Sequence, residues 1–321
     1  MHVYFWGTRG SLPASISSSM IEQKLFRALR LSRQYVLEDD EAIKKFIHTG
    51  LPFDVRGTYG SNTSCVEIRG LEEYVLCDAG TGLRDFGQAC MQAKTAGQSG
   101  RSRVFHLFIS HLHWDHMQGF PFFTPAYIPG HEIHIHGCHK DLEQAFIGQQ
   151  AAPFFPVPLE TMGADIFFHV MKPGNAYPVA GMTVTGIRQN HPGDSYGYRF
   201  EKAGKAIVYS TDAEHKQAAE HSQYEFVRFF HQADLLIFDA QYSLLDAMDT
   251  RENWGHSSNL VGVELAVRAG VRQLCLFHNE HVRDDAALDR VLEDTRKYLK
   301  IFDSSSDLKV HMAYDGMALT L

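Results

Sequence analysis

The chain has 321 residues, and its hydrophobic content of 44% is ample for a globular core. Its 30 basic and 38 acidic side chains give a formal net charge of -8, which disfavours nonspecific attraction to nucleic acid. No run of about 18 apolar residues exists that would indicate a membrane span. The N-terminus enters strand-like sequence without a basic region or a cleavage site, so we predict a cytoplasmic protein without membrane contact.

Short apolar segments rich in β-branched and aromatic residues recur along the chain and predict strands. These segments are residues 2–6, 65–69, 74–78, 104–110, 132–136, 166–171, 182–187, 206–210, 235–239, 273–278 and 309–314. Helical periodicity is found at residues 21–47, 142–149, 224–231, 260–269 and 286–301. Sheets covered by outer helices fit this order best. The five cysteines are odd in number and well separated, which predicts buried thiols rather than disulfides.

Residues 14–56 are predicted to be an inserted helical element that packs on the body rather than forming a lid. Ser19 and Glu22 have the spacing of a capping box at its first helix, and Ser258 and Asp285 are expected to cap the last two helices. We find no internal repeat, low-complexity tract or long linker. The sequence therefore predicts a single domain over residues 1–321 that carries this helical insertion.

The passage His111-Leu112-His113-Trp114-Asp115-His116 directly follows an apolar run that indicates a buried strand. Its imidazoles and carboxylate exceed what one ion can comfortably bind, whereas two adjacent ions can use them all. A histidine-rich set with few carboxylates favours zinc, and less firmly iron or manganese. The alternative is a surface histidine cluster that binds no ion.

Three further candidate ligands stand where later strands end. His191 precedes a Pro-Gly turn, Asp212 follows an apolar run, and His278 ends another. Each residue alone is equally consistent with a structural role, as a turn histidine, a helix cap or a rim residue. Their recurrence at strand ends favours a shared site.

The histidine-rich passage, followed by His, Asp and His in that order, resembles the metallo-β-lactamase-fold hydrolases. The resemblance covers most of the chain and implies an α/β fold of the αββα type, a sandwich of two mixed β-sheets with helices on the outer faces. Asp78 resembles the family's early aspartate, which braces the histidine loop. The passages at residues 6–11, 62–65, 195–199 and 255–258 resemble the branch of ribonuclease Z and cyclic-phosphate phosphodiesterases.

The resemblance also implies a ligand set for two divalent ions. One ion would be held by three histidines, the other by an aspartate and two histidines, and a further aspartate would bridge them. In that order, the implied ligands are His111, His113 and His191; Asp115, His116 and His278; and Asp212. Such shells leave room for a shared hydroxide and for a substrate oxygen.

Two departures from the family are visible. The chain has no long basic arm rich in glycine and proline of the kind that ribonuclease Z uses to hold tRNA, and its overall charge is negative. These two features disfavour tRNA processing as its function. The helical insertion after Pro13 is not expected in the simplest members, and its role stays open.

Two ions about 3.5–4 Å apart can activate a bridging water for attack on phosphorus. Asp115 is predicted to orient that hydroxide as well as to ligate an ion. His256 is the candidate acid that protonates the leaving group, and Asp239 is the candidate partner that keeps it protonated. The alternative is that His256 only neighbours a helix cap and that Asp239 is structural.

We expect a small or medium phosphodiester as substrate, such as a cyclic nucleotide, a cyclic phosphate or a short RNA end. The alternatives are a lactone or thioester hydrolase on the same site, a noncatalytic metal-binding module, and a diiron oxidoreductase, whose relatives carry Glu where His113 stands. A homodimer is a further expectation. Arg9, Ser11 and Arg199 are candidates either for phosphate contacts or for loop hydrogen bonds.

A second histidine-rich stretch follows the first by about fifteen residues. It contains His131, His134, His136 and His139, of which His134 and His136 share one face of a predicted strand. Matching carboxylates and later ligands are missing, so we predict exposed strand histidines rather than a metal site.

Overall fold

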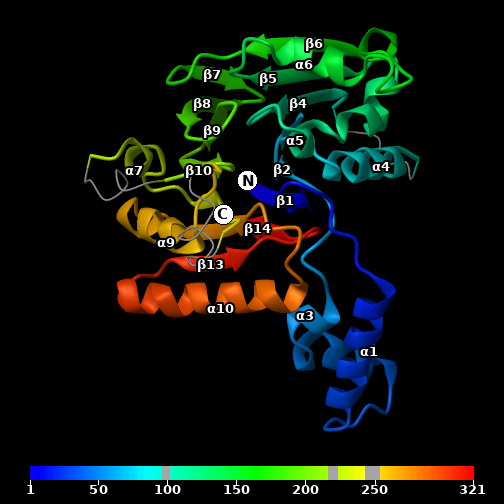
Figure 1. Cartoon of the computed structure of the whole chain (residues 1–321), viewed down its shortest axis with the longest axis vertical. Helices are drawn as coiled ribbons and strands as arrows, with labels where there is room; N and C mark the ends of the chain where they lie inside the picture. The colour runs from blue at the N-terminus through cyan, green and yellow to red at the C-terminus, as the bar shows by residue number, and fades with distance from the viewer. Residues whose placement is uncertain (96–101, 216–222, 243–253) are drawn as a thin grey trace.

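The computed structural model describes residues 1–95, 102–215, 223–242 and 254–321, and Figure 1 shows its two packed sheets with helices outside them. The described strands form two seven-stranded sheets with the orders β14-β1-β2-β3-β4-β5-β6 and β13-β12-β11-β10-β9-β8-β7. The strands are β1 (His2–Gly7), β2 (Cys65–Arg69), β3 (Tyr74–Cys77), β4 (Val104–Phe108), β5 (Glu132–Gly137), β6 (Asp165–Val170), β7 (Ala176–Val179), β8 (Met182–Gln189), β9 (Ser195–Lys202), β10 (Lys205–Ser210), β11 (Leu235–Asp239), β12 (Gln273–Phe277), β13 (Lys309–Met312) and β14 (Ala318–Thr320).

The described helices lie mainly outside the two sheets. The α-helices are α1 (Ser18–Ser32), α2 (Asp40–Lys45), α3 (Phe53–Arg56), α4 (Gly82–Thr95), α5 (Trp114–Met117), α6 (Leu142–Gln149), α7 (Glu225–Phe229), α9 (Asn259–Arg268) and α10 (Asp285–Phe302). A π-helical turn covers Phe46–Gly50, and short 3-10 turns cover Phe120–Phe122, Thr124–Tyr127 and Leu159–Thr161.

Three apolar cores hold these layers together. The central core lies between the sheets, where Phe5 and Phe108 of one sheet meet Phe200 and Phe277 of the other. Phe86 of α4 belongs to an outer core on the first sheet, and the other outer core packs α9 and α10 on the second. Because each sheet is buried on both faces, the predicted αββα sandwich of two mixed sheets is confirmed.

The parallel parts of both sheets determine where polar loops gather. In the first sheet β3 runs parallel to β4, and in the second β10, β11 and β12 are parallel neighbours. The carboxyl ends of parallel strands lie at one edge of a sheet, and the loops that follow them form a natural binding site there. The candidate residues follow the ends of these strands: Asp78, His111, Asp212, Asp239 and His278.

The predicted insertion at residues 14–56 forms a helical arm that projects away from the two sheets at the lower right of Figure 1. The Lys24 ammonium anchors the arm to α10 through an ion pair of 2.7 Å with Asp285. Phe46, Leu51 and Val55 give the arm a small core of its own. The arm thus contacts the body at its base, while side chains such as Leu29 stay exposed, so the expected packing on the body is limited to that base.

Several local predictions were wrong. The helical stretch 21–47 is broken after Ser32 and resumes at Asp40. The first helix is capped by Ser17 rather than Ser19, and α10 is capped by Asp284 rather than Asp285, whereas Ser258 caps α9 as predicted. Strands β7, β9 and β14 and helix α4 were not predicted.

The second histidine-rich stretch was also misjudged, because His131 and His136 are buried. The His136 ring stacks on Phe108 between the sheets at a centroid distance of 4.6 Å, and its Nε2 lies 3.0 Å from Nδ1 of His106. Glu73 in turn lies 2.8 Å from Nε2 of His106. These histidines are therefore part of the packing of the first sheet, with an acidic group at one end.

Two other predictions can be compared with the described residues. All five cysteines are free thiols, and four of them are buried. Among the described helices, none combines the length and the hydrophobicity that a bilayer crossing requires.

Candidate metal centre

Asp78, which follows β3, holds the loop after β4 through hydrogen bonds. One carboxylate oxygen of Asp78 accepts a hydrogen bond from the Ser110 backbone N–H at 2.7 Å. The other lies 2.7 Å from His116 Nδ1 and accepts the Tyr209 hydroxyl at 2.6 Å. Because Asp78 is fully buried, these contacts hold the histidine loop in one position against both sheets.

His111, His113 and His191 form one half of the centre, with ligand-type nitrogens within 4.8 Å of one another. Nε2 of His191 lies 3.2 Å from Nδ1 of His113. Nδ1 of His191 donates to the Gly255 carbonyl at 2.9 Å, which leaves its Nε2 lone pair directed into the centre. We call this group the three-histidine half.

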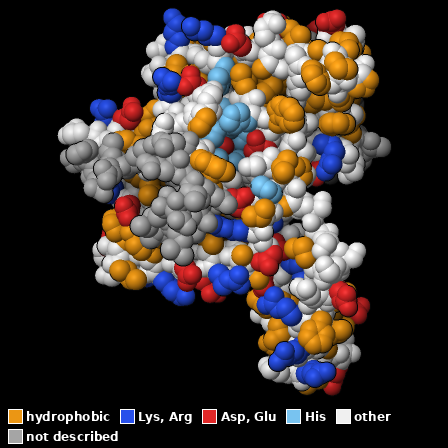
Figure 2. Space-filling model, viewed as in Figure 1, with side chains coloured by type: hydrophobic (Ala, Val, Ile, Leu, Met, Phe, Trp, Pro, Cys, Tyr) orange, Lys and Arg blue, Asp and Glu red, His pale blue; other side chains and the backbone are white. Residues whose placement is uncertain are grey.

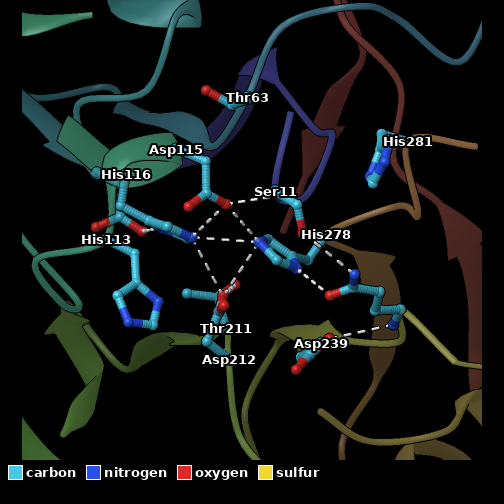
Figure 3. Close-up of polar contacts among 12 residues, drawn as sticks. Ser11, Thr63, His113, Asp115, His116, Thr211, Asp212, Asp239, His278 and His281 are labelled. Carbon is cyan, nitrogen blue, oxygen red and sulfur yellow. Dashed lines mark hydrogen bonds and ion pairs between the residues drawn. The ribbon is translucent and has the colours of Figure 1, made fainter. Parts of the chain in front are cut away.

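Asp115, His116 and His278 form the other half, which is buried. One oxygen of Asp115 lies 3.1 Å from Nε2 of both His116 and His278, and it accepts the Ser11 backbone N–H at 2.8 Å. Nδ1 of His278 lies 3.1 Å from the Gln241 side-chain oxygen, which directs Nε2 inward. Figure 3 shows these side chains facing one another, with His281 outside the group.

Asp212 lies between the two halves and directs one carboxylate oxygen toward each. Oδ1 is 3.4 Å from Nε2 of both His116 and His278. Oδ2 is 3.6 Å from Nε2 of His111 and 3.9 Å from Nε2 of His191. Asp212 thus has one oxygen for each half, and its role as the bridging ligand stays a prediction.

The donor set fits two divalent cations. Nε2 of His111 is buried without a hydrogen-bond partner among the described residues, which is costly unless a cation uses its lone pair. Burial lowers the pKa of His111, His113 and His191, so these rings are neutral near pH 7, the form that binds metal. Six histidine and aspartate side chains around one more aspartate thus provide a dinuclear site.

His256 and Asp239 stand beside this centre as a hydrogen-bonded pair. Nδ1 of His256 lies 2.9 Å from a carboxylate oxygen of the buried Asp239, and its ring lies 5.2 Å from that of His278. Burial opposes protonation of His256, but the Asp239 carboxylate outweighs it and raises the pKa to about 9. The ring is therefore an imidazolium at neutral pH, with Nε2 free to donate.

Three residues of the site have a backbone conformation that L-amino acids rarely adopt. Asp78, Asp212 and His278 have φ angles of 62°, 49° and 60°, although none is glycine. Asp78 and His278 directly follow β3 and β12, and Asp212 lies two residues after the end of β10. Such conformations cost about 1–3 kcal/mol each and persist where the surroundings enforce them.

Arg9, Ser11 and Arg199 were candidates either for phosphate contacts or for loop hydrogen bonds, and the structure places them differently. Arg9 is buried and donates to the carbonyls of Gly60 and Arg283, so it makes loop hydrogen bonds. Arg199 likewise donates to the Phe229 carbonyl. Only Ser11 reaches the centre, through its backbone N–H.

Sequence reasoning missed the residues that support the ligands. Gln241 orients His278, Tyr209 and Ser110 bind Asp78, and the Gly255 carbonyl orients His191. Two of these residues could have been found from their proximity to predicted site residues in the sequence. Gln241 lies two residues after Asp239, and Ser110 directly precedes His111.

Residues 73–279 match the model of the β-lactamase superfamily domain, which covers more than half of the chain. The chain belongs to the metallo-β-lactamase superfamily. It is 26% identical over 310 aligned positions to a ribonuclease Z from Methanosarcina acetivorans, covering 78% of this chain and 92% of that protein.

Two solved structures share the fold of the chain. The metallo-β-lactamase fold protein YhfI from Bacillus subtilis has a TM-score of 0.61 at 18% identity, covering 99% of this chain and 97% of YhfI. The zinc-bound PqqB from Methylobacterium extorquens has a TM-score of 0.62 at 15% identity, with all of both chains covered. At these identities the likeness establishes the fold, and the substrate has to be inferred from the site.

Proposed function

We propose that this superfamily member is a dinuclear metal-dependent phosphodiesterase in which His256 protonates the leaving group. The observation that carries the proposal is the ion pair of His256 and Asp239 beside the two metal-ligand groups, with Nδ1 2.9 Å from the carboxylate. When an alkyl phosphodiester is hydrolysed, one P–O bond breaks and the leaving group departs as an alkoxide, which needs a proton at that moment. Hydrolysis of a thioester makes a weaker demand for such an acid, because a thiolate departs more readily than an alkoxide. A lactone also releases an alkoxide, so the substrate panels below distinguish it from a phosphodiester.

The residues of both halves would hold the two cations, and the imidazole-rich set favours zinc, with manganese or iron as alternatives. When bound, such ions supply an activated water and neutralise charge on the phosphoryl oxygens. Asp115 is proposed to orient this water in addition to serving as a ligand.

His256 and Asp239 together supply the proton that the leaving group needs. Asp239 accepts Nδ1–H of His256 and also accepts the backbone N–H groups of Ala213 and Gln241, each at 3.1 Å. These bonds fix the carboxylate, which in turn fixes the imidazole ring. Nε2 of His256 then donates its proton to the departing oxygen, and Asp239 stabilises the positive charge that precedes the transfer.

As substrate we propose a small or medium phosphodiester, such as a cyclic nucleotide, a cyclic phosphate or a short RNA end. The name of the Methanosarcina relative, a ribonuclease, supports action on a phosphodiester. The net charge of -8 argues against a large polyanion such as tRNA.

The test is His256→Ala, assayed on two diesters whose leaving groups differ in basicity. We expect kcat to fall by about 100-fold or more for an alkyl leaving group, and by less for bis(p-nitrophenyl) phosphate, because p-nitrophenolate departs without a proton. Elemental analysis should still find two metal ions per chain. His231→Ala is the matched control, because His231 is exposed and lies outside the metal-ligand groups.

Full activity of His256→Ala on the alkyl diester would remove the acid role. Turnover of acyl-lactones without turnover of any diester would instead favour a carbon-ester hydrolase. A fully metal-loaded protein that is inactive on both panels would indicate a noncatalytic module.

A further inference from the structure

Two of the three tryptophans in the chain are exposed, and both adjoin the metal centre. Trp6 is partly buried and donates its indole N–H to Glu67 at 2.9 Å. By contrast, Trp114 is 84% exposed and Trp254 is 60% exposed. Large aromatic side chains stabilise a fold chiefly through burial, so the fold makes little use of the Trp114 indole.

The backbones of both exposed tryptophans adjoin the three-histidine half. Trp114 follows His113 directly and begins α5. Trp254 precedes Gly255, whose carbonyl accepts the hydrogen bond from His191 and whose Cα packs against that ring. The His113 and His191 rings are themselves neighbours, with a centroid distance of 5.0 Å. A continuous path of contacts thus joins the backbone of one tryptophan to that of the other across this half.

The metal centre opens to solvent on the same side. Of the six residues that make up the two halves, His113 is exposed and the other five are buried. Figure 2 shows histidine and acidic side chains reaching the surface in the middle of the molecule, with hydrophobic side chains next to them. A substrate that approaches from the His113 side therefore meets the two indoles before it reaches the ligands.

We propose that Trp114 and Trp254 form an aromatic platform for a nucleobase attached close to the scissile phosphate. The proposal rests on the proposed phosphodiesterase function and specifies its substrate class as a nucleoside phosphodiester rather than an aliphatic one. Bases stack on indole faces with little dependence on sequence. Trp254 lies two residues before His256, so it contacts the base on the side of the leaving group, and Trp114 contacts the substrate on the side of His113.

The test compares two five-membered cyclic phosphodiesters that differ in the base. Adenosine 2′,3′-cyclic phosphate carries one, and glycerol 1,2-cyclic phosphate does not. Trp114→Ala and Trp254→Ala are each expected to raise KM for the adenosine compound about tenfold, and to leave KM for the glycerol compound within about twofold. Trp114→Phe and Trp254→Phe, which keep an aromatic face, restore most of the affinity. Ile301→Ala removes an equally exposed hydrophobic side chain on α10 and leaves both KM values unchanged.

A second readout does not depend on turnover. Adenosine 3′-monophosphate should quench the tryptophan fluorescence of the full-length protein, whereas glycerol phosphate should not, and Trp114→Ala should weaken the quenching. Equal changes in KM for both substrates, or no change with either, together with absent quenching would overturn the platform. If the metal-loaded wild type cleaves neither diester, the proposed phosphodiesterase function is wrong. The fluorescence quenching by adenosine 3′-monophosphate then tests the aromatic platform independently of turnover.

The nucleobase can come from a free cyclic nucleotide or from an RNA end. The dinucleotide ApA presents the same base within an RNA strand. Whichever of ApA and adenosine 2′,3′-cyclic phosphate has the higher kcat/KM identifies the source.

Discussion

The Nδ1 atom of His116 lies 2.7 Å from a carboxylate oxygen of Asp78, and both side chains are fully buried. This contact fixes which nitrogen of His116 faces the metal centre. We expect Asp78→Asn to weaken zinc affinity by about 10- to 100-fold, because an amide orients the ring less firmly and lowers its basicity. Asparagine tolerates the positive φ of this position, so the fold should persist.

Competition with a chromogenic zinc chelator measures this effect, and circular dichroism checks the fold. Asp194→Asn is the control, since Asp194 also has a φ of 60° and its side chain, 46% exposed, pairs with Arg188. The backbone contacts of Asp194 with the His191 carbonyl and with Nε2 of His139 do not involve the substituted group. Equal zinc affinity in both variants would contradict the role of Asp78.

Metal binding should release protons from the centre. Burial opposes protonation of His116, but Asp115, Asp212 and Asp78 outweigh it and hold its pKa well above the ordinary value. The metal-free protein therefore carries a proton on His116 at pH 7, which a cation must displace. Calorimetric zinc titrations in buffers of different ionisation enthalpy measure the released protons, and a binding enthalpy independent of the buffer would refute this state.

A methyl group at Gly255 should disturb the three-histidine half. A Cβ there would lie 2.2 Å from Nδ1 of His191, and the φ of 86° already disfavours alanine. We expect Gly255→Ala to lose about one of the two metal ions per chain, because His191 loses both its position and its carbonyl partner. Elemental analysis after gel filtration reports the metal content.

The matched control for that variant is Gly174→Ala. Gly174 has a φ of 81° but no heavy atom within 4 Å of the added Cβ. It reproduces the backbone strain without the clash, so its metal content should stay at two ions per chain. A parallel loss in both variants would point to strain alone.

The pH dependence of kcat should report His256. Its pKa is raised to about 9 because the contact with Asp239 outweighs the cost of burial. A raised value means that the acid is protonated at neutral pH, so kcat on an alkyl diester should fall as the pH rises through about 9. Asp239→Asn should move this decline to lower pH. A decline with the same midpoint in both proteins would assign it to another group.

The buried His136 should make the fold sensitive to acid. Burial lowers its pKa to about 2, so the folded state disfavours its protonation. Stability is complete above the unfolded pKa of about 6.5 and is lost progressively as the pH falls below it. Between pH 6.5 and 5 the loss from this group is about 2 kcal/mol.

Urea unfolding in the presence of EDTA tests this expectation. We expect the free energy of unfolding of His136→Gln to fall less between pH 7 and 5 than that of the wild type, because glutamine does not titrate. Identical slopes against pH would show that His136 is not the group responsible.

The prediction of the ligands from sequence relied on strand ends. Asp212 and His278 follow runs that are visibly apolar, and the carboxyl ends of parallel strands converge, so their proximity was predictable. The partners that orient the ligands were not predictable in this way. Tyr209 lies 131 residues from Asp78, and Gln241 lies 37 residues from His278. The contact of Tyr209 with Asp78 depends on the packing of the two sheets, and that of Gln241 with His278 on the paths of the loops after the adjacent strands β11 and β12. No local pattern specifies either of them.

The missed elements have local causes. Strand β9 has charged residues near its end and a glycine near its start, β7 contains Pro178, and β14 is three residues long. Each weakens the alternation that indicates a strand. The burial of His136 was missed because alternation identifies the face of a strand but does not reveal that a second sheet covers it.

The backbone conformations of Asp78, Asp212 and His278 couple metal supply to the lifetime of the protein. Without cations, the chain must hold three unfavourable φ angles and a cluster of facing carboxylates and imidazoles, so its native state should unfold more often. Cells starved of the metal would then degrade this protein faster than metal-replete ones. Its abundance would follow metal availability even at a constant rate of synthesis.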